Sequence, residues 1–466
     1  MVTRDDILGS MKADGSRVRL QPADVRGRFM NWRRAAFTAL IAFYVAGPFI
    51  PVGGHPMIHL DVARRRFYFF GQTFNAQDFW LVLLLALVFV FGLLLVTAWR
   101  GRVWCGWACP QSVFLEGVYR PIERFIDGSR EQRLKLDAAP WSPLKVFKRV
   151  SKFVVFLVVS AAIAHTATAL FVSPRELWLM INEGPAEHLE AFLLTVGFTA
   201  LLQFNFWWFR EQFCVVLCPY GRLQSVLHDK DSVTVAYREA RGEPRGKLVK
   251  LPTLQAPPRG DCVDCNRCVV VCPTGIDIRK GLQMECLACT ACIDACDDVM
   301  DKVHRPRGLI GFASQRELAT GARKTLRPRV VVYAGLFVIA LVTLLVSLTL
   351  RTPFEANVVR ARGAMPFVVD GERVTNAFEV HLFNKQPEEA EFSIAVRAPA
   401  GANVVVGTPV LHLGSLEDAR IPVSVSVARF QANTEFTVEV TDLTSGSVRQ
   451  LPMRFMGPTS AQRSSP

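Results

Sequence analysis

Five long apolar runs divide the chain, and each is close to the ~20 helical residues that are needed to cross a bilayer. The runs cover residues 35–52, 79–98, 153–172, 191–209 and 330–350. The first run contains Gly47 and Pro48, which a membrane helix tolerates at its end where neighbouring helices pack beside it. The pattern predicts an α-helical bundle of five transmembrane helices.

Lys and Arg are distributed unevenly among the segments that connect these runs. Residues 1–34 contain eight, 100–150 ten and 210–329 twenty, whereas 51–78 contain three and 173–190 one. Segments rich in Lys and Arg face the cytoplasm, so we expect a multi-pass protein of a bacterial inner membrane with its N-terminus inside and its C-terminus in the periplasm. The N-terminus has no apolar core before a small-residue cleavage site, and we therefore expect no signal peptide.

The order and composition of the segments along the chain predict a multi-domain membrane protein. A cytoplasmic N-terminal segment (1–34) precedes four transmembrane helices with Cys-x3-Cys-Pro repeats (35–210), a Pro-, Gly- and base-rich cytoplasmic linker (211–259), a cysteine-dense insert (260–310), the fifth transmembrane helix (330–350) and a β-rich tail (353–458). In the tail, EFSIAV, IPVSVSV and EFTVEV alternate apolar and polar residues between turn residues. This alternation predicts a periplasmic immunoglobulin-like β-sandwich.

The composition supports a membrane protein and excludes a nucleic-acid-binding one. Half of the residues are hydrophobic, and the formal net charge is +13. Because the basic excess is spread over three connecting segments, it is a topology signal rather than one face that could bind nucleic acid.

Eight of the twelve cysteines form two runs with the x2, x2, x3 spacing of bacterial 4Fe-4S proteins. DCVDCNRCVVVCPTG contains Cys262, Cys265, Cys268 and Cys272, and ECLACTACIDACDD contains Cys286, Cys289, Cys292 and Cys296. Three cysteines of a tight loop reach one cubane, and the fourth points to the other. We therefore predict a ferredoxin-like domain with two 4Fe-4S clusters, one bound by Cys262, Cys265, Cys268 and Cys296 and the other by Cys286, Cys289, Cys292 and Cys272.

Zinc and disulfides are the alternatives for these cysteines. Zinc takes cysteines in separated pairs, which fits two four-cysteine runs poorly. Disulfides do not suit thiols on the cytoplasmic side of a membrane, where they stay reduced. Asp297 stands where a proline usually follows the last cysteine of such a run, but this departure removes no ligand.

The remaining four cysteines lie where the second and fourth runs end, in WCGWACPQ and REQFCVVLCPYG. Cys105 and Cys109 form one pair and Cys214 and Cys218 the other, and we call the four the membrane-edge cysteines. A spacing of four places each pair on one helix face, where it could chelate a soft metal such as Cu(I), exchange a disulfide, or pack as small apolar side chains. The recurrence of the pattern in two helix-pair repeats favours function.

Two other groups are weaker metal or redox candidates. His165 lies inside the third run, where an ionisable residue suggests function but is equally well explained by a hydrogen bond to a neighbouring helix. The segment HPMIH, with His55, Met57 and His59, could hold copper weakly, but an ordinary loop is the better interpretation.

The order of WCGWACPQ, REQFCVVLCPYGR, RGEPRG, GDCVDCNRCVVVCPTGIDIR and CLACTACIDACDDVMDK between five apolar runs resembles that of the CcoG (FixG, RdxA) cytochrome c oxidase accessory proteins. The likeness is strong over 35–350 and looser in the tail. It implies a polyferredoxin-like membrane protein that reduces Cu(II) to Cu(I) for assembly of a cbb(3)-type oxidase, with copper ions, oxidase assembly factors or a copper transporter as partners. The membrane-edge cysteines would then be the sites of copper reduction or transfer.

Three hypotheses follow for the activity. The first is a cupric reductase that passes electrons from the clusters to Cu(II) at the membrane-edge cysteines. The second is an electron-carrying subunit of a larger respiratory complex, and the third is an assembly scaffold with the clusters as sensors. No Rossmann-type glycine motif or flavin site is visible, so the electron donor is a separate, unidentified molecule.

Overall fold

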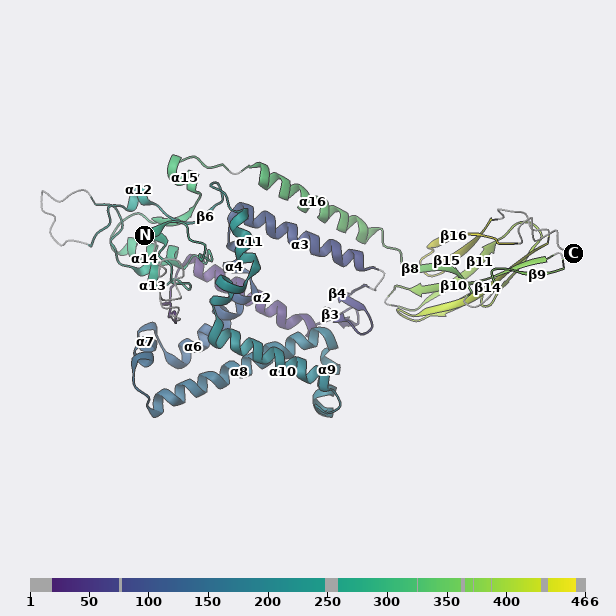
Figure 1. The fold of residues 1–466 in the computed structure, drawn as a ribbon, viewed down its shortest axis with the longest axis horizontal. Helices are drawn as coiled ribbons and strands as arrows, with labels where there is room; N and C mark the ends of the chain where they lie inside the picture. The colour runs from purple at the N-terminus through teal and green to yellow at the C-terminus, as the bar shows by residue number, and fades with distance from the viewer. Residues whose placement is uncertain are drawn as a thin grey trace. The chain divides into compact units, whose positions relative to one another are not determined.

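The computed structural model describes residues 19–457 except 75–77, 248–258, 325, 362–364, 372, 387 and 429–434. The chain divides into two compact units (Figure 1). The first, which we call the helical unit, comprises Met1–Val62 and Val82–Leu344, and the second comprises Ala63–Leu81 and Leu345–Pro466.

Four helices in the described residues are long and apolar enough to cross a membrane. They are α3 (Phe79–Arg100), α8 (Pro143–Val172), α10 with the π-helical turn η3 (Leu189–Phe209) and α16 (Pro328–Thr349). The first predicted crossing forms α2 (Arg28–Phe49), but it is not among these four. Its first two turns carry Arg28, Arg33 and Arg34, which lower its hydropathy. Five crossings are therefore not confirmed, whereas four are supported.

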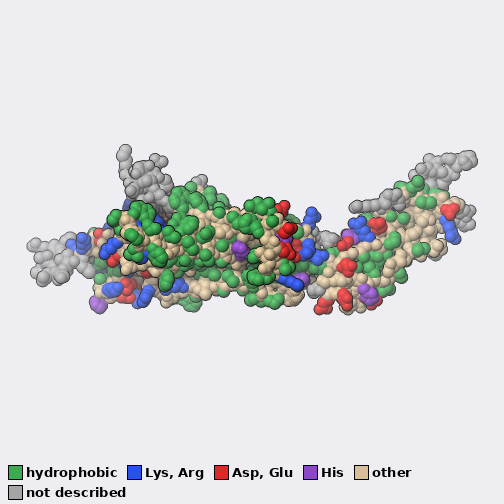
Figure 2. Space-filling view, turned by 90° about the horizontal axis from the view of Figure 1, so that it is seen from below, with side chains coloured by type: hydrophobic (Ala, Val, Ile, Leu, Met, Phe, Trp, Pro, Cys, Tyr) green, Lys and Arg blue, Asp and Glu red, His purple; other side chains and the backbone are tan. Residues whose placement is uncertain are grey.

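The membrane helices pack in pairs and turn apolar side chains outward. The helix α8 packs along α10, with the Thr168 and Thr195 hydroxyls 2.9 Å apart at the interface. The helix α16 runs beside α3 (Figure 1), where the ring of Phe337 contacts Gly92. Hydrophobic side chains cover much of the surface of the helical unit in Figure 2, and residues such as Phe89, Leu194 and Ile339 are more than half exposed. Such a surface is expected of helices that face lipid.

Each Cys-x3-Cys-Pro motif interrupts the helical chain in the same way. After α3 come α4 (Val103–Trp107), α5 (Pro110–Phe114), the π-turn η2 (Leu115–Tyr119), α6 (Arg120–Asp127) and α7 (Arg130–Ala138). After η3 (Asn205–Phe209) come the π-turn η4 (Phe213–Leu217) and α11 (Pro219–Leu227). In both motifs the second cysteine is an extended N-cap and the proline begins the next helix, where its missing N–H costs nothing.

The cysteine-dense insert is small and is fastened by a two-stranded sheet. It contains α13 (Arg267–Val270), the 3-10 turn η5 (Ile278–Lys280) and α14 (Ala291–Lys302). The strand β6 (Thr234–Tyr237) pairs antiparallel with β7 (Ile310–Ala313) and so closes the insert at both ends. Val235, Ile293 and Met300 are among the buried residues that join the sheet to the cysteine loops.

The second unit is mainly a sandwich of two antiparallel sheets. One sheet has the order β12-β14-β10-β8, with β9 also pairing with β10, and the other has the order β13-β11-β15-β16. Strand bounds are β8 Phe354–Arg360, β9 Val368–Asp370, β10 Arg373–Asn384, β11 Ala390–Arg397, β12 Ala402–Val406, β13 Val410–Leu413, β14 Asp418–Ala428, β15 Glu435–Asp442 and β16 Val448–Arg454. Alternate residues of β10, β14 and β15 are buried, as the sequence pattern predicts.

Shorter elements complete both units. The helical unit also contains β1 (Pro51–Val52), β2 (His55–Pro56), β3 (Ile58–Asp61), α9 (Pro174–Glu183), α12 (Glu239–Gly242) and α15 (Gln315–Thr320). In the second unit β4 (Arg66–Phe69) pairs antiparallel with β5 (Gln72–Phe74). Asp78 of this unit accepts from Arg351 at 2.7 Å and from Lys385 at 3.1 Å, which fastens this hairpin segment to the sandwich.

Candidate functional site

The two cysteine loops of the insert share an unusual backbone. Asp264 and Asn266 in the first loop and Ala288 and Thr290 in the second all have positive φ, at the same positions relative to the cysteines. Non-glycine residues pay about 1–3 kcal/mol for strain of this kind, so the loops are held in it by their surroundings. Successive N–H groups in such turns form a concave nest that receives anionic groups, including iron–sulfur clusters.

Each loop has the fourth cysteine of the opposite run as a neighbour. Burial, together with the nearby first-loop thiols, Cys268 foremost, and Asp297, raises the pKa of Cys296 to about 12. Burial likewise raises the pKa of Cys292, whose neighbours are Cys289, Cys286 and Cys272 of the second group and then Cys268 of the first. The thiols would therefore ionise only beside a compensating cation.

The residues fit a cubane. Cys272, Cys286, Cys289 and Cys292 line one small cavity, and Cys268 of the first run also reaches its wall. Its apolar lining is Val235, Ile276, Ile278 and Leu287. Among the described residues, no three His, Cys, Asp or Glu side chains are grouped so as to hold a single metal ion. A cubane is larger than one ion and takes its sulfur ligands from four sides, so loops of this spacing suit it better than zinc.

The structure places the four membrane-edge cysteines in one electrostatic neighbourhood, although no three of these four described residues are grouped so as to hold a single metal ion. Cys214 has Cys109, Cys105 and Cys218 as electrostatic neighbours, although Cys105 and Cys214 come from different repeats. Burial raises the pKa of Cys105 to about 12, while Arg102 lowers it. The same arginine acts on Cys214 and on Cys286 of the second cluster loop. Arg102 is therefore a shared cation between the membrane-edge cysteines and that loop.

The first membrane-edge loop lies directly against the second cluster loop. A Cβ atom on Gly106 would be 2.5 Å from the Leu287 carbonyl oxygen and 3.0 Å from that of Ala288, so only glycine permits this approach. The Gly106 carbonyl in turn accepts a buried 2.8 Å hydrogen bond from Arg33 Nε of α2. Two loops that carry redox-capable thiols are thus in direct backbone contact.

Side chains of each repeat brace the other repeat. Gln111 and Asn205 exchange two hydrogen bonds of 3.2 and 2.7 Å, and Gln111 also donates to the Arg210 carbonyl at 2.9 Å. Tyr220, which occupies the equivalent position after the second proline, lies 2.6 Å from the Thr97 hydroxyl of α3. These contacts fix the two cysteine pairs relative to each other.

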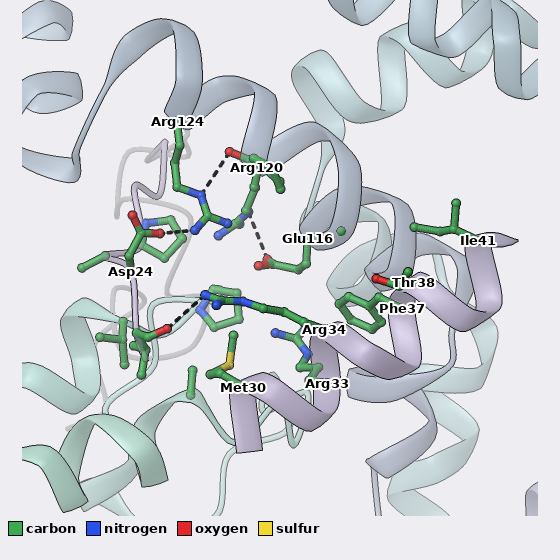
Figure 3. A pocket seen from close by; sticks show the side chains of 18 of the residues that line it. Asp24, Met30, Arg33, Arg34, Phe37, Thr38, Ile41, Glu116, Arg120 and Arg124 are labelled. Carbon is green, nitrogen blue, oxygen red and sulfur yellow. Dashed lines mark hydrogen bonds and ion pairs between the residues drawn. The ribbon is translucent and has the colours of Figure 1, made fainter. Parts of the chain in front are cut away.

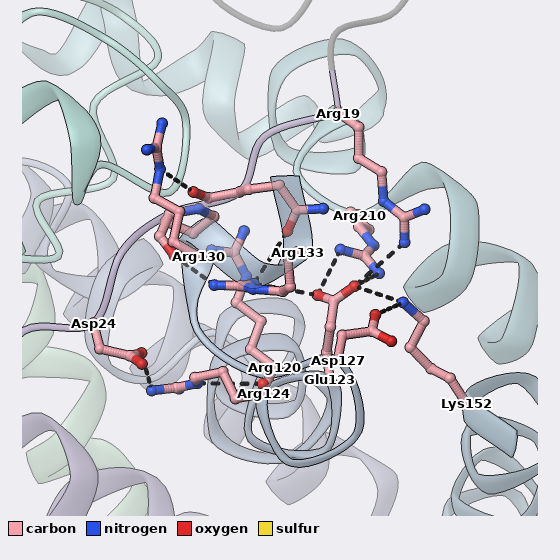
Figure 4. Close-up of polar contacts among 12 residues, drawn as sticks. Arg19, Asp24, Arg120, Glu123, Arg124, Asp127, Arg130, Arg133, Lys152 and Arg210 are labelled. Carbon is pink, nitrogen blue, oxygen red and sulfur yellow. Dashed lines mark hydrogen bonds and ion pairs between the residues drawn. The ribbon is translucent and has the colours of Figure 1, made fainter. Parts of the chain in front are cut away.

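A buried charge network fixes the turn that precedes Cys214 (Figure 4). Arg210 has a positive φ of 49° and donates two 3.1 Å hydrogen bonds to Glu123 of α6. Lys152 and Arg19 donate to the same carboxylate at 3.2 and 3.3 Å. Burial alone would raise the pKa of Glu123, but Arg210 and the other cations lower it far below the ordinary value.

The sequence indicated some of these residues and missed others. The two recurring motifs, WCGWACPQ and REQFCVVLCPYG, contain Gln111, Arg210 and Tyr220, but nothing in one sequence assigned their partners. Arg33, Arg102 and Glu123 carried no recognisable signal, because their roles depend on residues that are distant in the chain. Gly106 alone could have been suspected, as a glycine between two cysteines.

The weaker histidine candidates remain weak. His165 Nδ1 lies 2.7 Å from the Ala161 carbonyl oxygen one turn earlier in α8, and its ring lines an apolar cavity of about 520 Å3 among α8, α9 and α10. His55 and His59 lie on the short strands β2 and β3. They belong to no metal-binding group of three or more His, Cys, Asp or Glu side chains among the residues that the structure describes.

Family models match three parts of the chain. A 4Fe-4S dicluster domain matches residues 209–315, a 4Fe-4S binding domain matches 82–128, and the IG-like fold at the C-terminus of FixG matches 344–458. These matches confirm the predicted iron–sulfur module and the immunoglobulin-like tail. The match over 82–128 also covers Cys105 and Cys109, which the cysteine spacing had not assigned to iron.

Relatives match over most of their length. The chain is 35% identical to the nitrogen fixation protein FixG of Rhizobium meliloti over 436 residues, which cover 84% of this chain and 82% of FixG. It is 35% identical to the protein RdxA of Cereibacter sphaeroides over 82% of both chains. It is 22% identical to the ferredoxin-type protein NapH of Haemophilus influenzae over 59% of this chain and 89% of NapH.

Proposed function

Since the chain belongs to the FixG/RdxA family and is a membrane iron–sulfur electron-transfer protein, we propose that it reduces Cu(II) to Cu(I) at the membrane-edge cysteines. The Cu(I) would serve the assembly of a cbb(3)-type cytochrome c oxidase. In this proposal copper is the substrate, and its partners are oxidase assembly factors or a copper transporter.

The ligand sets of the proposal follow the crossed arrangement. Cys262, Cys265, Cys268 and Cys296 bind one 4Fe-4S cluster, and Cys286, Cys289, Cys292 and Cys272 bind the other. The thiol neighbours of Cys296 and Cys292 support this assignment. A bound cluster supplies reversible one-electron transfer. The protein holds seven of the eight ligands in buried or half-buried positions, whereas Cys265 is exposed.

The packing of Gly106 on the second cluster loop is the observation that carries the proposal. An electron that leaves this loop reaches the membrane-edge cysteines across van der Waals contact. Thiolates are soft ligands that favour Cu(I) over Cu(II), so the site stabilises the product. Each step takes one electron from a reduced protein and converts one Cu(II) ion into one Cu(I) ion.

The first experiment measures Cu(I) formation by anaerobically reduced protein with a Cu(I)-specific chelator. We expect Cys105→Ser with Cys214→Ser to abolish copper reduction while the absorbance of the clusters stays. Cys265→Ser is the reciprocal control, which should lose cluster absorbance and activity together. Full activity of the membrane-edge double variant would remove these thiols from the reaction.

A second role for the membrane-edge cysteines is favoured by the 4Fe-4S binding model over 82–128. The four thiols would then be ligands of a further cluster rather than a copper site. The iron content separates the two roles, because two cubanes require about eight irons per chain and three require about twelve. Under the copper proposal, iron content is the same with and without the four membrane-edge thiols.

The similarity to NapH keeps the electron-carrying subunit as the rival function. A subunit of a larger complex would reduce copper poorly by itself and would co-purify with a redox partner. Copper reduction by the isolated chain argues against this rival, and reduction that appears only on adding a co-purified subunit argues for it.

Sidedness is also part of the proposal. The Lys- and Arg-rich segments 1–34, 100–150 and 210–329 support a cytoplasmic position for the cluster module and the membrane-edge cysteines, in a bacterial inner membrane. The C-terminal sandwich would then lie in the periplasm. The periplasmic position of the sandwich can be tested with a cysteine introduced at Val405, which is exposed. A membrane-impermeant thiol reagent should label this cysteine in intact spheroplasts.

A further inference from the structure

A cavity of about 510 Å3 lies where the first turns of α2 meet η2, α6 and the cluster module (Figure 3). Arg33 on its wall bonds to Gly106, so the cavity lies at the level where α3 ends and the membrane-edge loop begins. Val271, Pro273 and Ala291 of the cluster module form another wall. The cavity is distinct from the cysteine sites.

The described lining of this cavity carries more positive than negative charge. Five arginines and two carboxylates line it: Arg33, Arg34, Arg120, Arg124, Arg133, Asp24 and Glu116. Both carboxylates are already paired, Glu116 with Arg120 and Asp24 with Arg124. Arg133 is paired with Glu123, which does not line the cavity, at 3.8 Å. Arg33 and Arg34 therefore contribute positive charge that no carboxylate among the described residues pairs.

Three of these arginines are almost fully buried and leave hydrogen-bond donors unused. Arg33, Arg120 and Arg133 are 2%, 4% and 3% exposed. Four of their nitrogens have no hydrogen-bond partner among the residues that the structure describes: Arg33 Nη2, Arg120 Nε and Nη1, and Arg133 Nε. Of these, Arg120 Nε forms an ion pair with Glu116 at 3.0 Å. Unpaired buried donors on a cation are costly, so an anionic acceptor at this place would stabilise the protein.

The α2 wall of the cavity carries apolar side chains beside Arg33 and Arg34. Met30, Phe37 and Ile41 line it along one face of the helix, and the Arg33 guanidinium lies 4.8 Å from the centre of the Phe37 ring. A ligand that matches both the arginines and the apolar side chains of this lining carries an anion at one end and an apolar chain at the other. A neutral redox lipid such as a quinol would leave the cationic excess uncompensated.

We propose that this cavity binds the phosphate headgroup of an anionic phospholipid, with the start of an acyl chain against Phe37 and Ile41. Arg33 Nη2 and Arg120 Nη1, which have no hydrogen-bond partner among the described residues, suit phosphate oxygens, which accept charge-assisted hydrogen bonds. Basic pockets between membrane helices are known to receive such headgroups. The lipid would join α2 and α6 to the cluster module, and the proposal is independent of copper reduction.

The test uses the full-length chain, delipidated in detergent and transferred to phosphatidylcholine bilayers with or without phosphatidylglycerol. Native mass spectrometry counts the phosphatidylglycerol that stays bound. We expect Arg33→Gln with Arg34→Gln to weaken retention by about 30-fold, since each arginine contributes roughly a factor of five toward an anionic lipid. Thr38→Trp, which fills the cavity without changing its charge, should also displace the lipid.

Arg28→Gln is the matched control, because Arg28 is exposed on the same helix and does not line the cavity. It should retain phosphatidylglycerol as the unaltered chain does, and cluster absorbance should report intact folding in all variants. The proposal would be overturned if the double variant and Thr38→Trp both retained as much phosphatidylglycerol as the unaltered chain. Displacement of the lipid by inorganic phosphate or by a water-soluble quinone at similar concentrations would also overturn it, in favour of a free-anion or quinone site.

Discussion

The two Cys-x3-Cys-Pro loops share an extended second cysteine and a proline that begins the next helix, but their surroundings differ. The first loop contacts the second cluster loop through Gly106, whereas the residue equivalent to Gly106 in the second motif is Val215. The second loop is held by the charge network of Arg210 and Glu123 and by a positive-φ turn. The first repeat therefore contacts the cluster module. The second repeat contributes Cys214 and Cys218 from a loop that the charge network holds in place.

Removing the support of the second loop should have the largest effect. In Glu123→Gln, the buried Arg210 and Lys152 lose a shared carboxylate, and breaking a buried ion pair in this way costs about 3–5 kcal/mol. We expect a large fall in the thermal midpoint of the detergent-solubilised protein, measured by the loss of cluster absorbance. Glu131→Gln is the control, because Glu131 is exposed on α7. Equal midpoints for the two variants would contradict a structural role for the network.

The same carboxylate gives a pH dependence. The folded pKa of Glu123 lies far below its ordinary value of 4.5, so its contribution to stability is fully present above pH 4.5 and is lost as the pH falls toward the folded pKa. We expect the thermal midpoint of the unaltered protein to fall below pH 4.5 more steeply than that of Glu123→Gln. Parallel acid profiles would show that Glu123 does not carry this dependence.

Widening the contact of the first loop should affect electron transfer more than stability. Gly106→Val places methyl groups where the Leu287 and Ala288 backbone lies, so the two loops must separate. A misplacement of about 1 Å at a reacting site can cost about 100-fold in rate, and we expect a loss of this size in copper reduction with cluster content preserved. Gly197→Ala in α10, where a Cβ atom meets nothing within 4 Å, should leave the rate unchanged. A normal rate in Gly106→Val would place the electron path elsewhere.

The smallest effects on stability should come from the hydrogen bonds that Gln111 and Tyr220 form between the two repeats, and the two residues should contribute unequally. Tyr220→Phe removes one hydrogen bond to Thr97 and should cost about 1 kcal/mol. Gln111→Ala removes three hydrogen bonds and leaves buried polar groups of the second repeat unpaired, so we expect two to three times that cost. Denaturant midpoints of the two variants measure the difference. If Tyr220→Phe lowered the denaturant midpoint more than Gln111→Ala did, the Tyr220 contact would stabilise the protein more than the Gln111 contacts do, contrary to this prediction.

Regular patterns made much of the architecture predictable. The helices α3, α8, α10 and α16 follow from apolar runs of sufficient length, and β10 and β14 from strict alternation. The first crossing was less predictable: the structure forms a helix there, but arginines precede the apolar run within α2, and α2 is not among the four described helices that are apolar enough to span a membrane. The iron–sulfur module followed from cysteine spacing, since a cubane constrains how far apart its ligands are in the chain.

The sequence by itself determined the family, the cysteine runs, four membrane helices and the β-rich tail, because each depends on residues that are close together in the chain. Only the tertiary structure decided that Cys105 and Cys214 are neighbours, that Gly106 packs on Leu287, and that arginines from α2, α6 and α7 share one cavity. These contacts join segments that are tens to hundreds of residues apart. Their energies arise from burial and from partners that local sequence does not specify.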